Sequence, residues 1–218
     1  METIEVIRLV SYSINAVASI VLAGYFIREF WMKRLRASLA WGIGFLLFGV
    51  AVINLYTLAA IEMSKFAVYI GYIFSSAFIS FLYYGASLLF FKEGSFFREK
   101  MAVIYFLIVL FIGWILTYIS PVEQIPELGG YMMFFFVFIY LVISLLFYRV
   151  SRRVPEEDPR RRTLTLVALA WILIAGWQSY IGPGWGVSRP IEIAAYALGS
   201  LGFLLLLYGM TTGKTTKR

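Results

Sequence analysis

The chain of 218 residues contains no cysteine and no histidine, and asparagine and glutamine together occur only four times. Thiolate and imidazole are the ligands of most zinc and haem sites, so these absences argue against both kinds of site. They also exclude thiol and histidine catalysis, and with it zinc-dependent membrane hydrolases and serine–histidine hydrolases. We therefore expect no cofactor, no metal and no enzymatic activity. The low content of asparagine and glutamine is typical of proteins from thermophilic organisms.

Charged residues are scarce as well. They make up 14% of the chain, against about 25% in soluble domains, while 61% of the residues are hydrophobic. The apolar residues form seven continuous runs of about 20 residues each, the length of a helix that crosses a bilayer core. Their expected boundaries are approximately 6–27, 39–61, 66–91, 102–119, 131–148, 164–181 and 191–210. The runs do not alternate with polar residues, so they predict helices and not the strands of a barrel.

The first run is predicted to be a retained helix and not a signal peptide, because Glu2 and Glu5 precede it instead of a basic segment. The chain 1–218 is then a single all-α membrane domain, a bundle of seven transmembrane helices. Sixteen of the nineteen lysines and arginines fall on one side of this bundle, and the other three are Arg8, Lys65 and Arg189. Because cytoplasmic loops carry the excess of basic residues, we expect the N-terminus outside the cell membrane and the C-terminus inside. The net charge of +7 follows from this topology, so no nucleic-acid binding is expected.

Polar residues inside membrane helices are costly and are therefore candidates for function. In the first run, Arg8, Ser11, Asn15 and Ser19 recur at intervals of three and four residues, which places them on one helix face. At 1.5 Å per residue, Asn15 lies about 15 Å and Asn54 of the second run about 12 Å from the outer side. One interpretation is that these two amides hydrogen-bond each other and hold neighbouring helices together, which contributes about 0.6 to 2 kcal/mol.

The other interpretation is that the two amides line a ligand-binding cavity that opens to the outside. Its further members are polar residues at the outer ends of the last two runs, namely Gln178, Tyr180, Arg189 and Glu192. No carboxylate or lysine lies near the middle of a predicted helix, where proton and ion pumps carry their charge. The sequence therefore disfavours an electrogenic pump, while a channel or a carrier for an uncharged solute stays open.

The most polar segment between predicted helices, 150–163, reads VSRRVPEEDPRRRT. Its two prolines oppose a continuous helix. One interpretation is that its arginines anchor the chain beside lipid phosphates on the cytoplasmic side of the membrane. In the alternative interpretation they dock a cytoplasmic or membrane signalling partner, and the docking residues are then Arg152, Arg153, Arg160, Arg161 and Arg162.

Tryptophans follow two patterns in the predicted helices. Four lie near helix ends, as tryptophans of the interfacial belt do, namely Trp31, Trp41, Trp114 and Trp185. Trp171 and Trp177 lie inside the sixth predicted helix, where they either line a ligand cavity or fill the bundle. We expect them to fill the bundle.

Seven helices with an outside N-terminus resemble the microbial rhodopsins in topology. That family binds retinal through a lysine of its seventh helix, but the run 191–210 contains no lysine and the third run no carboxylate counter-ion. No retinal pigment is therefore expected. The stretch RASLAWGIGFLLFGVAV, residues 36–52, resembles the second helix of the seven-helix sensor modules in archaeal and bacterial signalling receptors.

The resemblance to sensor modules implies a receptor-like protein. In such receptors a signalling domain follows the helices, whereas only about eight residues follow the run 191–210, so the signal is expected to pass to a separate partner. We expect a receptor-like or accessory membrane protein that binds a ligand or a membrane partner from the outer side and signals through its basic cytoplasmic loops. The alternatives are a small carrier or channel for an uncharged solute and a structural subunit of a larger membrane complex.

Overall fold

The computed structural model describes residues 3–60, 64–121, 125–181 and 189–212, with their side chains except at 3, 5, 54–60, 125–134, 181 and 189. These ranges form seven α-helices. The helices are α1 Thr3–Lys33, α2 Arg36–Ala60, α3 Lys65–Phe90, α4 Glu99–Ile119, α5 Ile125–Ser151, α6 Pro159–Ile181 and α7 Arg189–Thr212. The predicted all-α fold of seven helices is confirmed.

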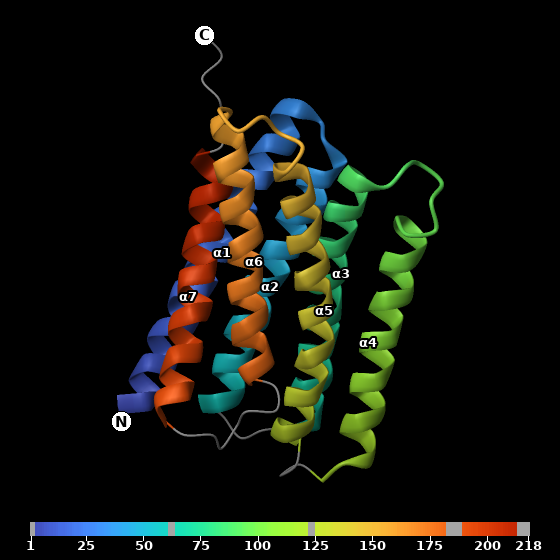
Figure 1. Cartoon of the computed structure of the whole chain (residues 1–218). Helices are drawn as coiled ribbons and strands as arrows, with labels where there is room; N and C mark the ends of the chain where they lie inside the picture. The colour runs from blue at the N-terminus through green and yellow to red at the C-terminus, as the bar shows by residue number, and fades with distance from the viewer. Residues whose placement is uncertain (1–2, 61–63, 122–124, 182–188, 213–218) are drawn as a thin grey trace.

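Consecutive helices run in opposite directions along a common axis (Figure 1). We call the end at which α1, α3, α5 and α7 begin the N-terminal end, and the opposite end the basic end. Six helices form a ring in the order α1, α2, α3, α5, α6 and α7, in which α7 packs against α1 and the contact between α3 and α5 is the weakest. The helix α4 lies outside this ring against α3, and it touches α5 much less (Figure 1).

Within the residues whose side chains are described, six of the seven helices are long and apolar enough to cross a membrane. The spans are Val6–Lys33, Arg36–Ile53, Lys65–Phe90, Glu99–Ile119, Pro159–Tyr180 and Pro190–Thr212. In α5 the apolar segment with described side chains, Phe135–Ser151, is shorter, because the predicted run 131–148 begins outside the described side chains. Large apolar side chains such as Val17 and Ile115 are exposed on the outward helix faces, which suits contact with lipid. The protein is a multi-pass helical membrane protein.

The helix α1 continues to Lys33, six residues beyond the predicted end of the first run. Arg34 follows with a left-handed backbone, at a φ of 56°, and α2 begins two residues later. The longer helix includes Glu29, which is buried and forms an ion pair with Lys33, Nζ to Oε2, at 2.6 Å. The helix end predicted from the sequence, at residue 27, would place Glu29 in a loop. The sequence therefore does not predict that the Glu29 carboxylate is buried. Glu29 lies four residues before the end of α1, away from the helix middle.

Aromatic rings fill the interior of the ring of helices. One series of adjacent rings links α6, α7, α2, α3 and α5, with centroids 4.9 to 6.1 Å apart, through Trp177, Phe203, Phe48, Phe78 and Phe136. A second series, with centroids 5.1 to 6.2 Å apart, runs through Tyr140, Trp171, Phe45, Phe26, Trp41 and Phe147. Such pairs stabilise a core by about 0.5 to 1.5 kcal/mol beyond their burial. Trp171 and Trp177 are buried among these rings, which agrees with the expectation that they fill the bundle.

The interfacial position predicted for Trp41 is wrong. Only 4% of this residue is exposed, and its indole lies over Gly85 of α3, where the missing side chain leaves room for the ring. The indole Nε1 donates a hydrogen bond to the carbonyl oxygen of Leu82 at 3.1 Å. A position near a helix end does not show whether a side chain faces lipid or the neighbouring helix. Here Trp41 faces α3, because Gly85 leaves room for its indole.

Candidate functional site

Polar side chains join α1 to α7 along the N-terminal half of the bundle. Both helices begin at the N-terminal end and lie side by side (Figure 1). Arg8 Nη2 donates a hydrogen bond to Glu192 Oε1 at 2.6 Å. About one turn further, Ser11 Oγ donates to the carbonyl oxygen of Tyr196 at 3.1 Å and lies 2.9 Å from Ser200 Oγ. The order of these contacts shows that the two parallel helices are in register over two turns.

Aromatic contacts reinforce the same contact line. The hydroxyls of Tyr12 and Tyr196 lie 3.5 Å apart, and their rings meet edge to face with centroids 5.7 Å apart. The Arg8 guanidinium lies 5.9 Å from the centre of the Tyr196 ring, within range of a cation–π interaction. We call this set the α1–α7 seam, and its members are Arg8, Ser11, Tyr12, Glu192, Tyr196 and Ser200.

The ion pair of the seam neutralises two charges within apolar helices. The side chains of Arg8 and Glu192 are 42% and 19% exposed, so both are partly buried within the protein. An isolated charge at this position in a membrane helix costs several kcal/mol, and pairing removes much of that penalty. The seam is therefore polar without carrying a net charge.

Asn15 lies one turn beyond Ser11 on the same face of α1 and is fully buried. Among the residues that the structure describes, neither its Oδ1 nor its Nδ2 has a hydrogen-bond partner. Buried polar groups nearly always have a partner, so this amide requires an explanation such as a bound molecule. Among the predicted ligand residues with described side chains, Asn15 is the one whose buried polar atoms lack hydrogen-bond partners.

The packing of α1 on α2 gives the level of Asn15 relative to α2. A Cβ on Gly42 would lie 2.8 Å from Ile27 Cγ1, and one on Gly49 would lie 3.3 Å from Ile20 Cγ1. The two helices are antiparallel, so each step forward along α1 matches one step back along α2, and residue 15 is level with residue 54. The similar depths predicted from the sequence therefore agree with the packing. The side chain of Asn54 lies outside the described residues, so the hydrogen bond between the two amides stays a prediction.

The helix α6 contributes the other predicted ligand residues. Tyr180 is half-buried and lies near the α1–α7 seam, close enough for the charges of Arg8 and Glu192 to act on its hydroxyl. Gln178 is buried in the bundle. The side chain of Arg189 lies outside the described residues. Of the six predicted ligand residues, the structure thus places Tyr180 and Glu192 together at the seam and buries Asn15 and Gln178.

The predicted ligand set contains Glu192 of the seam but omits its charged partner, Arg8. It lies on the polar face of α1 noted in the sequence, five residues from the start of its helix, and Glu192 lies three residues from the start of α7. Opposite charges at similar depths on two helices are a signal for pairing. The signal identifies a pair only when the two helices are known to be neighbours.

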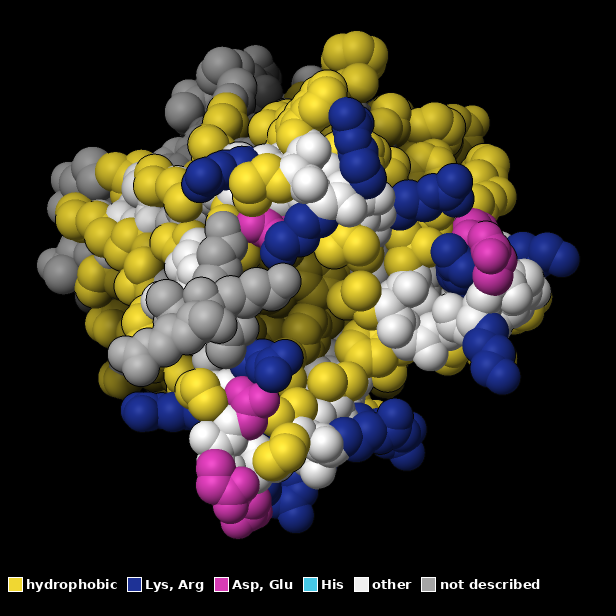
Figure 2. Space-filling model, turned by 90° about the horizontal axis from the view of Figure 1, so that it is seen from above, with side chains coloured by type: hydrophobic (Ala, Val, Ile, Leu, Met, Phe, Trp, Pro, Cys, Tyr) yellow, Lys and Arg dark blue, Asp and Glu magenta, His cyan; other side chains and the backbone are white. Residues whose placement is uncertain are grey.

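At the basic end, lysine and arginine side chains gather on the surface (Figure 2). Five arginines lie in and directly after the connection between α5 and α6. Arg161 Nη1 forms an ion pair with Glu156 Oε1 at 2.6 Å. Arg152, Arg153 and Arg162 are exposed, and none of the three forms an ion pair with a residue that the structure describes. Three of the five predicted docking arginines are therefore available for anionic groups, and a fourth is held by an exposed carboxylate.

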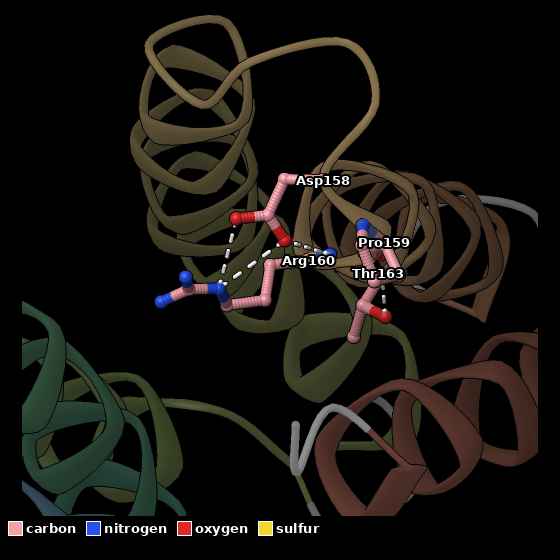
Figure 3. Close-up of polar contacts among 4 residues, drawn as sticks. All are labelled: Asp158, Pro159, Arg160 and Thr163. Carbon is pink, nitrogen blue, oxygen red and sulfur yellow. Dashed lines mark hydrogen bonds and ion pairs between the residues drawn. The ribbon is translucent and has the colours of Figure 1, made fainter. Parts of the chain in front are cut away.

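The fifth docking arginine belongs to the cap of α6 (Figure 3). Asp158 Oδ1 accepts a hydrogen bond from the backbone N–H of Arg160 at 2.8 Å, and Arg160 Nε lies 3.1 Å from Asp158 Oδ2. These donors hold the pKa of the Asp158 carboxyl below its ordinary value. Pro159 occupies the first helical position, where a missing N–H is harmless. An aspartate followed by proline therefore starts α6 at a defined residue, which fixes where its arginines emerge.

Comparison with protein-family models, curated proteins and solved structures finds no match to this chain. The resemblance of residues 36–52 to sensor helices stays a prediction from the sequence. Within the described ranges, no three acidic side chains lie together in a group that could hold a metal ion. The case for a function therefore rests on the α1–α7 seam, on Asn15 and on the basic end.

Proposed function

We propose that this protein is a receptor-like or accessory membrane protein with its N-terminal end outside the cell and its basic end in the cytoplasm. A polar ligand, or a polar group of a membrane partner, binds at the N-terminal half of the bundle between α1, α6 and α7. Its occupancy is passed to the arginines at the basic end, which contact a separate signalling partner. The orientation is supported by the excess of basic residues at one end of the bundle.

The observation that carries the proposal is the buried amide of Asn15. A side-chain amide has two donor hydrogens and an acceptor oxygen, and the bilayer core has no water to satisfy them. A ligand with its own donor and acceptor gains these hydrogen bonds without displacing any that the described residues make. Asn15 lies seven residues beyond Arg8, about 10 Å deeper along α1. A ligand that reaches Asn15 from the N-terminal end therefore passes the Arg8–Glu192 ion pair.

A single helix connects the ligand site with the docking surface. The helix α6 carries Gln178 and Tyr180 at the N-terminal end and the arginines 160–162 at the basic end. It meets α7 at three glycines, where an added Cβ would lie within 2.9 Å of an α6 side chain, namely Gly199, Gly202 and Gly209. Glycines at a helix contact let two backbones approach closely. We propose that a small shift of α6 relative to α7 at these close contacts passes the signal.

A carrier or channel has less support from the packing. The two aromatic series link the helices across the interior of the bundle. Rings that are packed in this way leave a solute no wide path along the axis in the present conformation. A structural subunit of a larger complex would use the same polar groups as contacts with a protein partner.

The test is native mass spectrometry of the protein after gentle extraction from its native membrane, with Asn15→Ala compared with the wild type. Ser19→Ala is the matched control, because Ser19 is also buried on this face of α1 but its hydroxyl is satisfied by the carbonyl oxygen of Asn15 at 2.7 Å. We expect a small-molecule adduct that survives in Ser19→Ala and is lost in Asn15→Ala. The ligand-free Asn15→Ala protein should be as stable as the wild type or more stable, because an unsatisfied amide is removed.

Other outcomes contradict the ligand proposal. If the Asn15 amide only pairs with Asn54, Asn15→Ala loses about 0.6 to 2 kcal/mol of stability and no adduct is found in any variant. A stoichiometric protein partner without an adduct makes the chain an accessory subunit. Solute flux in proteoliposomes that contain this protein alone makes it a carrier or channel.

A further inference from the structure

An open groove of about 310 Å³ lies beside the first turns of α6, at the basic end of the bundle. It is lined by Glu156, Arg161, Arg162, Thr165 and Leu166. The volume is at the lower end of the range for sites that hold small ligands. The groove combines two arginines with an apolar side chain, and it belongs to a helix that crosses the membrane from Pro159 onward. Its position is therefore at the level of the lipid headgroups.

The groove continues into an exposed stripe on the outward face of α6, which has no polar side chain from Leu169 onward. Arg162, Thr165, Leu169, Ile172 and Gly176 follow one another at intervals of three and four residues, so they lie on a single helix face. All five are exposed, and a Cβ added to Gly176 would meet no atom within 4 Å. The stripe is about 21 Å long, against about 15 Å for the half of a bilayer core that one leaflet fills. A lipid tail fits along it.

In the groove, the carboxylate of Glu156 forms an ion pair with Arg161, one of the two arginines. Glu156 Oε1 lies 2.6 Å from Arg161 Nη1, although the Glu156 side chain is 80% exposed and can swing into solvent. Arg162 is exposed beside this pair. A phosphate group offers the same acceptor oxygens as a carboxylate and is bound by arginine in the same geometry. Glu156 therefore holds the place that a phosphate would take on Arg161.

We propose that this groove is a binding site for one anionic phospholipid. Its phosphate lies between Arg161 and Arg162, and one acyl chain lies along the outward stripe of α6. The carboxylate of Glu156 competes with the phosphate for Arg161 and weakens binding. The site is separate from the α1–α7 seam. It uses Arg161 and Arg162 of the proposed docking surface, so a bound lipid leaves Arg152 and Arg153 for a cytoplasmic partner.

The test is a native mass spectrometry titration of the purified full-length protein with phosphatidylglycerol and with phosphatidylcholine of the same acyl chains. The measured quantity is the ratio of the two affinities. We expect the wild type to prefer phosphatidylglycerol. Glu156→Gln should raise the ratio by up to about fivefold, which corresponds to the upper end for an exposed ion pair. Arg162→Gln should lower the ratio about fivefold, as expected for one basic residue at an anionic surface.

The matched control is Glu157→Gln, which removes the same charge one residue away. Glu157 is exposed and does not line the groove. It should leave the ratio unchanged. Equal increases in Glu156→Gln and Glu157→Gln would mean that only the diffuse charge of the loop acts, which overturns the proposal. Since both variants change exposed residues of the loop, this comparison stands even if Arg162→Gln fails to fold.

Two further results separate the lipid from other anions. Inorganic phosphate in excess should not displace phosphatidylglycerol, because it lacks the acyl chain that lies on α6. Displacement by inorganic phosphate would reduce the site to a simple anion site and overturn the assignment to a lipid. An unchanged lipid ratio in Arg162→Gln together with the loss of a bound protein would assign this arginine to a protein partner, which also overturns it.

Discussion

Replacing Gly85 with alanine tests whether Trp41 lies where the packing of α2 on α3 places it. A Cβ at residue 85 would lie 1.7 Å from Trp41 Cδ1 and 2.2 Å from Trp41 Nε1, far inside any tolerated contact. The indole is enclosed, with the Phe26 ring 5.1 Å and the Phe147 ring 5.5 Å from its own ring centre. The tryptophan must therefore move against its neighbours, or the two helices must separate.

The magnitude follows from the contacts that are lost. The hydrogen bond from Trp41 Nε1 to the Leu82 carbonyl oxygen is broken, which costs about 0.6 to 2 kcal/mol in a membrane. Overpacking of the core adds about 1 to 3 kcal/mol. The better helix propensity of alanine offsets about 1 kcal/mol of this loss. Gly85→Ala should therefore lower the free energy of unfolding by about 1 to 4 kcal/mol.

The assay is reversible unfolding by sodium dodecyl sulfate in mixed micelles, which yields a free energy for each variant. Gly24→Ala and Gly176→Ala are the controls, because a Cβ at either position meets no atom within 4 Å. Both should be as stable as the wild type or slightly more stable. The double variant Trp41→Phe/Gly85→Ala should show a smaller penalty for the added methyl, because phenylalanine needs less room. If Gly85→Ala matches the two controls, the indole does not occupy the space over residue 85 and the reasoning is refuted.

Three further variants test other contacts. Ser11→Ala removes the hydroxyl that joins α1 to α7 and should cost about 0.6 to 2 kcal/mol in the same micelle assay, while Ser13→Ala, which is exposed, should change nothing measurable. Because the pKa of the Asp158 carboxyl lies below its ordinary value, its capping contribution is complete above the unfolded-state pKa of about 3.9 and is lost as the pH falls through the folded-state value. Asp158→Asn, whose amide oxygen still caps, should weaken this acid dependence of the thermal midpoint, and an unchanged dependence would assign it to other carboxylates. Tyr105→Phe removes the hydrogen bond to the carbonyl oxygen of Phe135 and should speed hydrogen exchange in α4 but not in α2; equal protection of α4 in both proteins would contradict this role.

The sequence predicts the helices well because each is a long local pattern. The predicted runs differ from the observed helices mainly at their ends. The clearest case is α1, where the chain continues in helical form to Lys33 and carries Glu29 into the bundle. Trp171 and Trp177 are buried, whereas Leu169 and Ile172 of the same helix are exposed, so a position in an apolar run does not by itself predict burial.

Contacts between helices are not predictable from one sequence in the same way. Arg8 and Glu192 are 184 residues apart, and only the closure of the ring brings their helices together. Trp41 is buried because Gly85 of another helix lies opposite it. The position of α4 outside the ring likewise depends on which faces of α3 and α5 are already covered, and an apolar run gives no sign of that.

The ring closes between the first and the last helix, so it can close only after the last helix has been synthesised. At about 5 to 20 residues per second, a ribosome needs about 10 to 40 s to make the 184 residues that separate Arg8 from Glu192. Throughout that interval α1 is in the membrane without the counter-charge of its arginine and without the serine and tyrosine partners on α7. The α1–α7 seam consequently forms only once α7 has been made, and a chain that stops before α7 leaves the most polar face of α1 open to lipid or to another protein.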